Sequence, residues 1–290
     1  MKIQFPLIFS TVAQRISLGM YVISLFCIKM WGLEIHLPLV AIIALGFYVM
    51  GILASSAHLG RPTRLINSFA NPSSHLTQEA ILSPLAGFFL FLVAINGFDF
   101  SKLGLDFLPI IQLGSMQTMV EMLAAFFCIL FCISTALVYQ LFARPAWKTR
   151  MVSINFFISF LAVGSAGAYA LASLTDVQGL QNLFNLCIAL QFINVIANIC
   201  YTIYVSRLSY GVAVNVFNDE FAGLYKTWIA TGAIVPAILF CLSAFYGINS
   251  WVLLAGSIIC SLAAWQAFFF LCGKQIKFFP QYKQDLKTIF

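Results

Sequence analysis

The sequence predicts an all-α membrane protein in which eight helices each cross the bilayer. Hydrophobic residues make up 62% of the chain and charged residues only 8%, where a soluble domain has about a quarter. The mean hydropathy is +0.97. Too few polar side chains are present to cover a water-soluble globule that also contains 30 Phe. The apolar residues form continuous runs and do not alternate, which excludes a transmembrane β-barrel.

A bilayer-spanning helix needs about 20 apolar residues. The runs that meet this length define one integral membrane domain over residues 1–290, with spans at about 7–30, 37–57, 80–98, 119–141, 151–174, 183–205, 227–245 and 251–271. The second and sixth spans are each followed by a long connection of similar length, at 58–79 and 206–226. This symmetry favours two four-helix bundles related as parallel repeats.

The first span has the basic start of a signal peptide, at Lys2, but Arg15 interrupts its apolar run. No small-residue cleavage site follows, so we expect a retained helix. Gln14 and Arg15 lie about a third of the way into the span. An arginine at mid-membrane costs about 3 kcal/mol. We therefore expect Arg15 to snorkel to the interface, to pair, or to face an aqueous cleft.

Spans two and three are joined by a segment that is rich in chemically useful side chains. Gly60 and Pro62 end the second span, which places His58 in its last turn at the membrane interface. Glu79 stands immediately before the third span. Between them lie two guanidinium groups and an amide: Arg61, Arg64 and Asn67.

This set of side chains suits a quinol, whose oxidation releases two electrons and two protons. His58, with an ordinary pKa of about 6.5, could accept one proton, and the Glu79 carboxylate could pass a proton on to water. The alternative is that His58 caps its helix while the arginines contact lipid phosphates. The residues themselves leave both interpretations open.

The later spans carry fewer signals. Glu121 lies near the start of the fourth span, and small residues over 162–170 predict close helix packing in the fifth. Pro236 predicts a kink in the seventh. One face of the sixth span carries a polar stripe, which should face the bundle interior: Gln191, Asn194, Asn198 and Tyr201. We favour interhelical hydrogen bonding for this stripe over a hydrated proton path.

Metal and haem chemistry are not expected in this chain. The eight cysteines include no Cys-x-x-Cys pair, so we predict no iron–sulfur cluster and no metal site. Only three histidines are present, and two of them fall in expected loops, so we predict no haem. The net charge of +6 is modest and scattered among loops, so we predict no nucleic-acid partner.

The orientation of the protein follows from its basic residues. An even number of spans places both termini on one side, and twelve of the fifteen Lys and Arg fall on that side, against two on the other. The positive-inside rule would then place the termini in the cytoplasm. A basic face can equally dock an acidic partner subunit, so the side of the membrane stays open.

Two segments resemble a known family. Residues 6–14 (PLIFSTVAQ), and residues 58–68 (HLGRPTRLINS) followed by Glu79, are similar to the membrane anchor subunit of anaerobic dimethyl sulfoxide reductase. The resemblance implies a subunit of the bacterial inner (cytoplasmic) membrane that binds and oxidises menaquinol during anaerobic respiration. It implies two partners, an iron–sulfur subunit and a molybdopterin catalytic subunit. It associates the positions of His58 and Glu79 with the quinol. Arg15 departs from the family pattern, and the implied termini lie outside, against the count of basic residues.

The sequence therefore supports three hypotheses. The first is the quinol-oxidising anchor subunit of a molybdoenzyme reductase, in which five further residues shape the quinol site or dock the iron–sulfur partner: Arg61, Arg64, Asn67, Gln14 and Arg15. The second is a secondary transporter, for which Arg15 and the polar stripe of the sixth span are the support. The third is a passive anchor without a quinol site.

Overall fold

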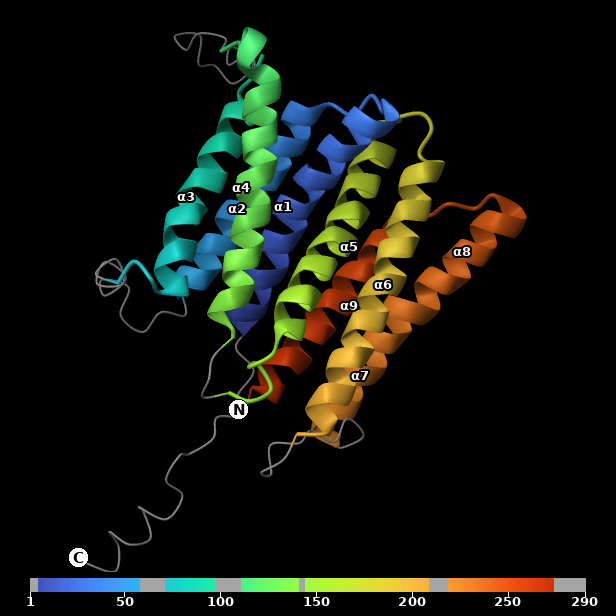
Figure 1. The fold of residues 1–290 in the computed structure, drawn as a ribbon. Coiled ribbons are helices and arrows are strands. Elements are labelled where there is room, and N and C mark those ends of the chain that lie inside the picture. Colours follow the sequence, from blue (N-terminus) through green and yellow to red (C-terminus); the bar gives the residue numbers. More distant parts are fainter. Residues whose placement is uncertain (1–4, 58–70, 98–110, 141–143, 209–218, 274–290) are drawn as a thin grey trace, which may run out of the picture.

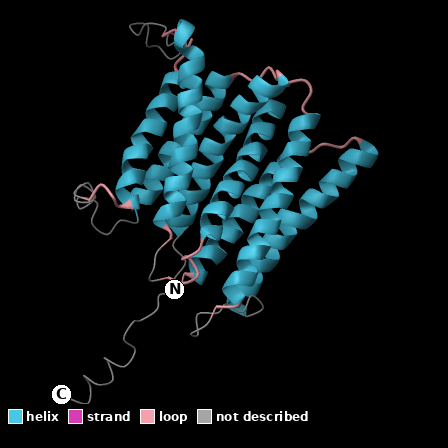
Figure 2. Cartoon of the chain, in the orientation of Figure 1, coloured by secondary structure: helices cyan, strands magenta, loops and turns pink. Residues whose placement is uncertain are grey.

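A computed structural model describes residues 5–57, 71–97, 111–140, 144–208 and 219–273 of the chain. Of these residues, 84% are helical and none forms a strand (Figure 2). Eight helical stretches are long and apolar enough to cross a membrane. The predicted fold class, an all-α membrane protein with eight spans, is therefore confirmed.

Most of the helices are long rods that lie side by side (Figure 1). In sequence order they are α1 (Phe5–Trp31), α2 (Leu37–Ala57), α3 (His75–Ala94), η3 (Gly114–Met116), α4 (Gln117–Val138), α5 (Arg150–Leu174), α6 (Gln181–Ser206), α7 (Asp219–Ile229), η4 (Ala230–Ile234), α8 (Val235–Tyr246) and α9 (Trp251–Cys272). Helix α1 begins and α9 ends at the same end of the bundle (Figure 1), which we call the terminal end.

The third span differs most from its predicted bounds. Helix α3 runs over His75–Ala94, whereas apolar residues alone predict 80–98. Ser74 occupies its N-cap position in an extended conformation, and the Thr77 hydroxyl of the first turn donates to the Asn71 carbonyl. A helix can begin in polar residues before the backbone reaches lipid depth, so hydropathy misplaces its start. Glu79 consequently lies on α3 itself and not before it.

The helices pack as two groups that meet along α1 and α5. Helices α1 to α4 contact one another on one side, and α5, α6 and α7 to α9 do so on the other (Figure 1). Gly19 and Gly164 form the closest approach between the groups. A Cβ atom added to Gly164 would lie 2.3 Å from the Gly19 carbonyl carbon. The small residues that the sequence places in the fifth span therefore allow the two backbones to touch.

The seventh span is interrupted where the sequence predicts a kink. Helices α7 and α8 are joined by η4, a π-helical segment that ends two residues before Pro236. Pro236 has no N–H for the carbonyl of Gly232, four residues earlier. The Gln191 side chain of α6 donates to that carbonyl, with an N–O distance of 2.9 Å. The polar stripe of the sixth span thus satisfies a backbone group that the proline leaves free.

Candidate functional site

The first group of helices encloses a cavity of about 310 Å³ close to the terminal end. Helices α1, α2, α3 and α4 each contribute to its wall, and Tyr139, which follows α4, completes it. Polar side chains line part of the wall: Ser10, Thr11, Gln14, Ser55, Ser56, Glu79, Ser83, Thr135 and Tyr139. The rest is mainly apolar: Leu7, Ile52, Leu76, Ala80, Phe131 and Val138. An apolar pocket with a few convergent polar groups is the usual form of a small-molecule site.

Glycine and proline shape two of these walls. A Cβ atom on Gly51 would lie 2.8 Å from Cγ of Gln14 and 3.2 Å from the Ser10 carbonyl oxygen, so the glycine lets α2 approach α1. On α3, Pro84 supplies no N–H to the carbonyl of Ala80, a cavity residue. That carbonyl therefore lacks its usual helical donor.

Among the described residues that line this cavity, Glu79 is the one carboxylate. It is half-buried on the second turn of α3, and its Oε1 accepts a hydrogen bond from the Thr135 hydroxyl of α4 at 2.7 Å. This distance is that of an ordinary hydrogen bond between a hydroxyl and a carboxyl oxygen. The structure thereby places Glu79 within a cavity, beside a hydroxyl that holds it in one orientation.

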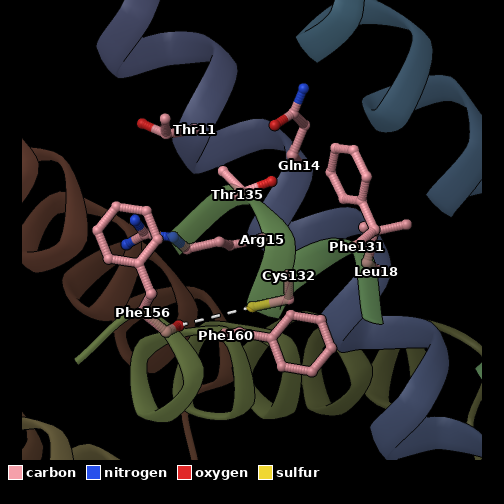
Figure 3. A pocket seen from close by; sticks show the side chains of 9 residues that line it. All are labelled: Thr11, Gln14, Arg15, Leu18, Phe131, Cys132, Thr135, Phe156 and Phe160. Atoms are coloured by element: carbon pink, nitrogen blue, oxygen red, sulfur yellow. Dashed lines mark hydrogen bonds between the residues drawn. The ribbon is translucent and has the colours of Figure 1, made fainter. Parts of the chain in front are cut away.

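Gln14 and Arg15 both belong to α1, a different helix from Glu79, in the same region. Gln14 lines both the large cavity and a small void of about 10 Å³ behind it, whereas Arg15 lines only the void (Figure 3). The two spaces also share Thr11, Phe131 and Thr135 as walls. Arg15 is only 5% exposed, which argues against snorkelling, the first of the three alternatives expected for it.

The Arg15 side chain reaches from α1 toward α5. Its Nη1 donates to the Ser159 hydroxyl at 2.9 Å, and its guanidinium carbon lies 3.7 Å from the centroid of the Phe156 ring. The thiol of Cys132 lies beside it and donates to the Phe156 carbonyl at 3.9 Å (Figure 3). Arg15 is therefore held by neutral groups from two other helices.

Sequence reasoning missed Thr135 and Tyr139, two polar residues of the cavity wall. Thr135 lines both spaces and binds Glu79. Tyr139 lines the large cavity four residues further along the chain. Neither residue carries a sequence signal, because a hydroxyl near the end of an apolar span becomes informative only when the neighbouring helices are known.

Four candidate residues, His58, Arg61, Arg64 and Asn67, lie outside the described residues. In the sequence, His58 directly follows Ala57, the last residue of α2. The preceding turn of α2 contributes Ser55 and Ser56 to the cavity wall. The segment that carries these four residues is thus joined directly to a helix that lines the cavity.

A second buried carboxylate lies far from this cavity, at the opposite end of the first group. Oε2 of Glu121, near the start of α4, lies 3.0 Å from the Lys29 ammonium, near the end of α1. Its Oε1 accepts from the Gln117 amide at 2.8 Å. This carboxylate is already paired with a cation of its own, so its arrangement is that of a structural link between α1 and α4.

The polar stripe of the sixth span faces the bundle interior, as predicted. All four of its members are at most 3% exposed: Gln191, Asn194, Asn198 and Tyr201. Besides the bond from Gln191 to Gly232, the Tyr201 hydroxyl donates to the Ala146 carbonyl at 3.0 Å. The stripe therefore joins α6 to neighbouring segments of the second group and takes no part in the cavity wall.

Among the described residues, no three of His, Cys, Asp and Glu gather in a way that could hold a metal ion. The same residues include eight cysteines, none of which forms a disulfide. The polar groups of the cavity are a carboxylate, an amide and several hydroxyls. Such groups suit an organic ligand that forms hydrogen bonds.

Fold and cavity together define a multi-pass helical membrane protein with a pocket that opens between four helices near one end. The model of the family described as DMSO reductase anchor subunit (DmsC) matches residues 1–267, and the protein belongs to this family. The C subunit of the anaerobic dimethyl sulfoxide reductase of Haemophilus influenzae is 28% identical over 176 residues. The match covers 58% of this protein and 58% of that relative, so the alignment spans little more than half the length of either.

Proposed function

We propose that this protein is the membrane anchor of a dimethyl sulfoxide reductase type complex in the bacterial cytoplasmic membrane, and that it oxidises a quinol in the cavity between α1, α2, α3 and α4. The observation that carries the proposal is the cavity of about 310 Å³ with Glu79 in its wall. A quinol ring is apolar and bears two hydroxyls, which matches a wall that combines apolar side chains with a few acceptors and donors. Family membership supports the anchor role.

In this proposal the Glu79 carboxylate accepts a proton from a quinol hydroxyl. Thr135 holds the carboxylate in place by donating to one of its oxygens, and acceptor capacity remains free for the substrate. His58, next in the sequence after α2, is the second proton acceptor. The two electrons leave to an iron–sulfur subunit and from there to a molybdopterin catalytic subunit. Menaquinol is the quinol that the family resemblance implies.

The assay compares two electron donors in the purified complex. Reduction of the terminal acceptor by an artificial dye does not need the quinol site, whereas reduction by a menaquinol analogue does. We expect Glu79→Gln to lower the quinol-driven rate about 100-fold or more, the usual contribution of a general base, and to leave the dye-driven rate unchanged. Glu34→Gln is the matched control, because Glu34 is an exposed carboxylate in the turn between α1 and α2 at the far end of the bundle.

His58→Ala in the same assay tests the second proton acceptor. We expect the quinol-driven rate to collapse while the dye-driven rate persists. Equal retention of both rates would exclude His58 from the quinol site.

The passive-anchor hypothesis makes a different prediction for binding. It requires that the complex co-purifies with its partner subunits but does not quench a fluorescent quinol-site inhibitor. Saturable quenching of the inhibitor fluorescence that is weakened by Glu79→Gln would favour the quinol site.

The transporter hypothesis draws on Arg15 and the polar stripe of α6. However, the cavity is lined by α1 to α4, whereas α6 packs against α5, η4 and α8. Substrate uptake by the anchor alone in liposomes would support the transporter hypothesis.

A further inference from the structure

Arg15 is a buried cation whose contacts in the described part of the protein are all to neutral groups. The ion pair found among the described residues joins Lys29 and Glu121, at the other end of the first helix group. The Arg15 guanidinium instead contacts the Ser159 hydroxyl and the Phe156 ring. A buried charge without an opposite charge is costly, so this arrangement favours any anion that can reach it.

One of the Arg15 nitrogens remains available. Nη2 is buried and has no hydrogen-bond partner among the described residues. Arg15 lines the void of about 10 Å³ behind the cavity, together with Thr11, Gln14 and Thr135 (Figure 3). A void needs roughly 10–15 Å³ and two to four polar partners to hold one water. The void meets both requirements and can seat one water.

The void shares four wall residues with the large cavity, so this water would lie between the guanidinium and a ligand in the cavity. Two opposite charges then act on the same ligand from different walls. Glu79 lines the cavity on α3, and the positive charge of Arg15 lies behind the wall formed by α1 and α4.

We propose that Arg15 is a positioning residue that, through a water in the void, makes the deep side of the cavity selective for a negatively charged ring oxygen. The proposal rests on the quinol site proposed above and adds which form of the ligand it prefers. When an O–H bond of the ligand breaks, its proton goes to the Glu79 carboxylate and the electron pair stays on the ring oxygen. Arg15 stabilises that anion and keeps its own protons.

The experiment measures binding of two quinone analogues to the intact complex. One is a long-chain 2-hydroxy-1,4-naphthoquinone, which is ionised at neutral pH, and the other is its neutral methyl ether. We expect the complex to bind the anion more tightly than the ether. In Arg15→Gln the anion should lose about tenfold or more in affinity, the value of a hydrogen bond to a charged group, while the ether keeps its affinity. Arg15→Lys, which keeps the charge, should restore most of the preference for the anion.

Ser159→Ala is the matched control. It removes the hydroxyl that binds Nη1 but leaves the charge of Arg15 in place, so the preference for the anion should survive. A purely structural role predicts that Arg15→Gln weakens both ligands equally or only lowers the yield of complex, and either result would overturn the proposal. If the Arg15→Gln complex does not assemble, the measurement on the unmodified complex decides. Equal affinity of that complex for the anion and for the ether would overturn the proposal. If neither analogue binds to the unmodified complex, the quinol site itself is wrong.

Discussion

Thr135→Val tests the part of the site that sequence reasoning missed. Valine has nearly the shape of threonine but no hydroxyl, so the substitution removes the bond to Glu79 without opening the packing. The oxygen–oxygen distance of 2.7 Å is that of an ordinary hydrogen bond, and in the proposed mechanism the carboxylate is ionised when it accepts the quinol proton. Such a bond is worth about 1.5–3 kcal/mol. Because Glu79 is half-buried and lines an open cavity, water can replace part of this interaction, and the lower end of the range applies.

A loss of about 1.4 kcal/mol corresponds to a tenfold change in rate. We therefore expect Thr135→Val to lower the quinol-driven kcat/KM about tenfold, and the dye-driven rate to stay unchanged. Thr135→Ser, which keeps the hydroxyl, should restore most of the activity. Ser134→Ala is the matched control, since it removes a buried hydroxyl one residue away that lies outside the cavity wall.

The assay becomes decisive as a double-mutant cycle with Glu79→Gln. If Thr135 acts through the carboxylate, the valine has little further effect once Glu79 is neutral. If the two substitutions instead lower the rate independently, so that their effects multiply, Thr135 does not act through the carboxylate. A Thr135→Val complex with the kinetics of the unmodified protein would also refute the reasoning.

Three further predictions concern other residues. Ser55→Trp places a large ring in the cavity wall and should abolish binding of a fluorescent quinol-site inhibitor, measured by quenching. Gly164→Leu forces α1 and α5 apart and should lower the free energy of unfolding by about 3 kcal/mol, seen as a lower Tm in detergent. Gly256→Leu is the control and should leave the Tm unchanged, because Gly256 has open space around it. Gln191→Leu removes the donor of the Gly232 carbonyl and should lower the free energy of unfolding by about 1–3 kcal/mol in the same assay. An unchanged Tm would show that another donor replaces Gln191.

Much of the fold follows from the sequence because lipid imposes one strong requirement. Every spanning segment must be helical and apolar over a fixed length, so counting apolar runs finds all eight spans. The bounds of α2 agree with the apolar run to the residue. The start of α3 does not, because four of the five residues from His75 to Glu79 are polar and extend the helix beyond lipid depth. Hydropathy reports where lipid lies and not where a helix begins.

The site could be predicted only in part, for a different physical reason. Glu79 attracts attention as the carboxylate that follows His58 and its two arginines, and the structure does place it in a cavity. Arg15 attracts attention because an arginine within a span is costly, but a sequence cannot reveal that Ser159 and Phe156 of α5 would hold it. Thr135 gives no signal, because its importance lies entirely in which residue of another helix it faces.

The central claim is that a quinol binds between α1, α2, α3 and α4. Photo-crosslinking of the purified complex with an azido-naphthoquinone tests it most directly, with labelled peptides located by mass spectrometry. We expect labels on cavity residues of α1, α3 and α4, and we expect excess menaquinol analogue to prevent this labelling. Labels confined to α6 to α9, or labels that the analogue does not displace, would contradict it.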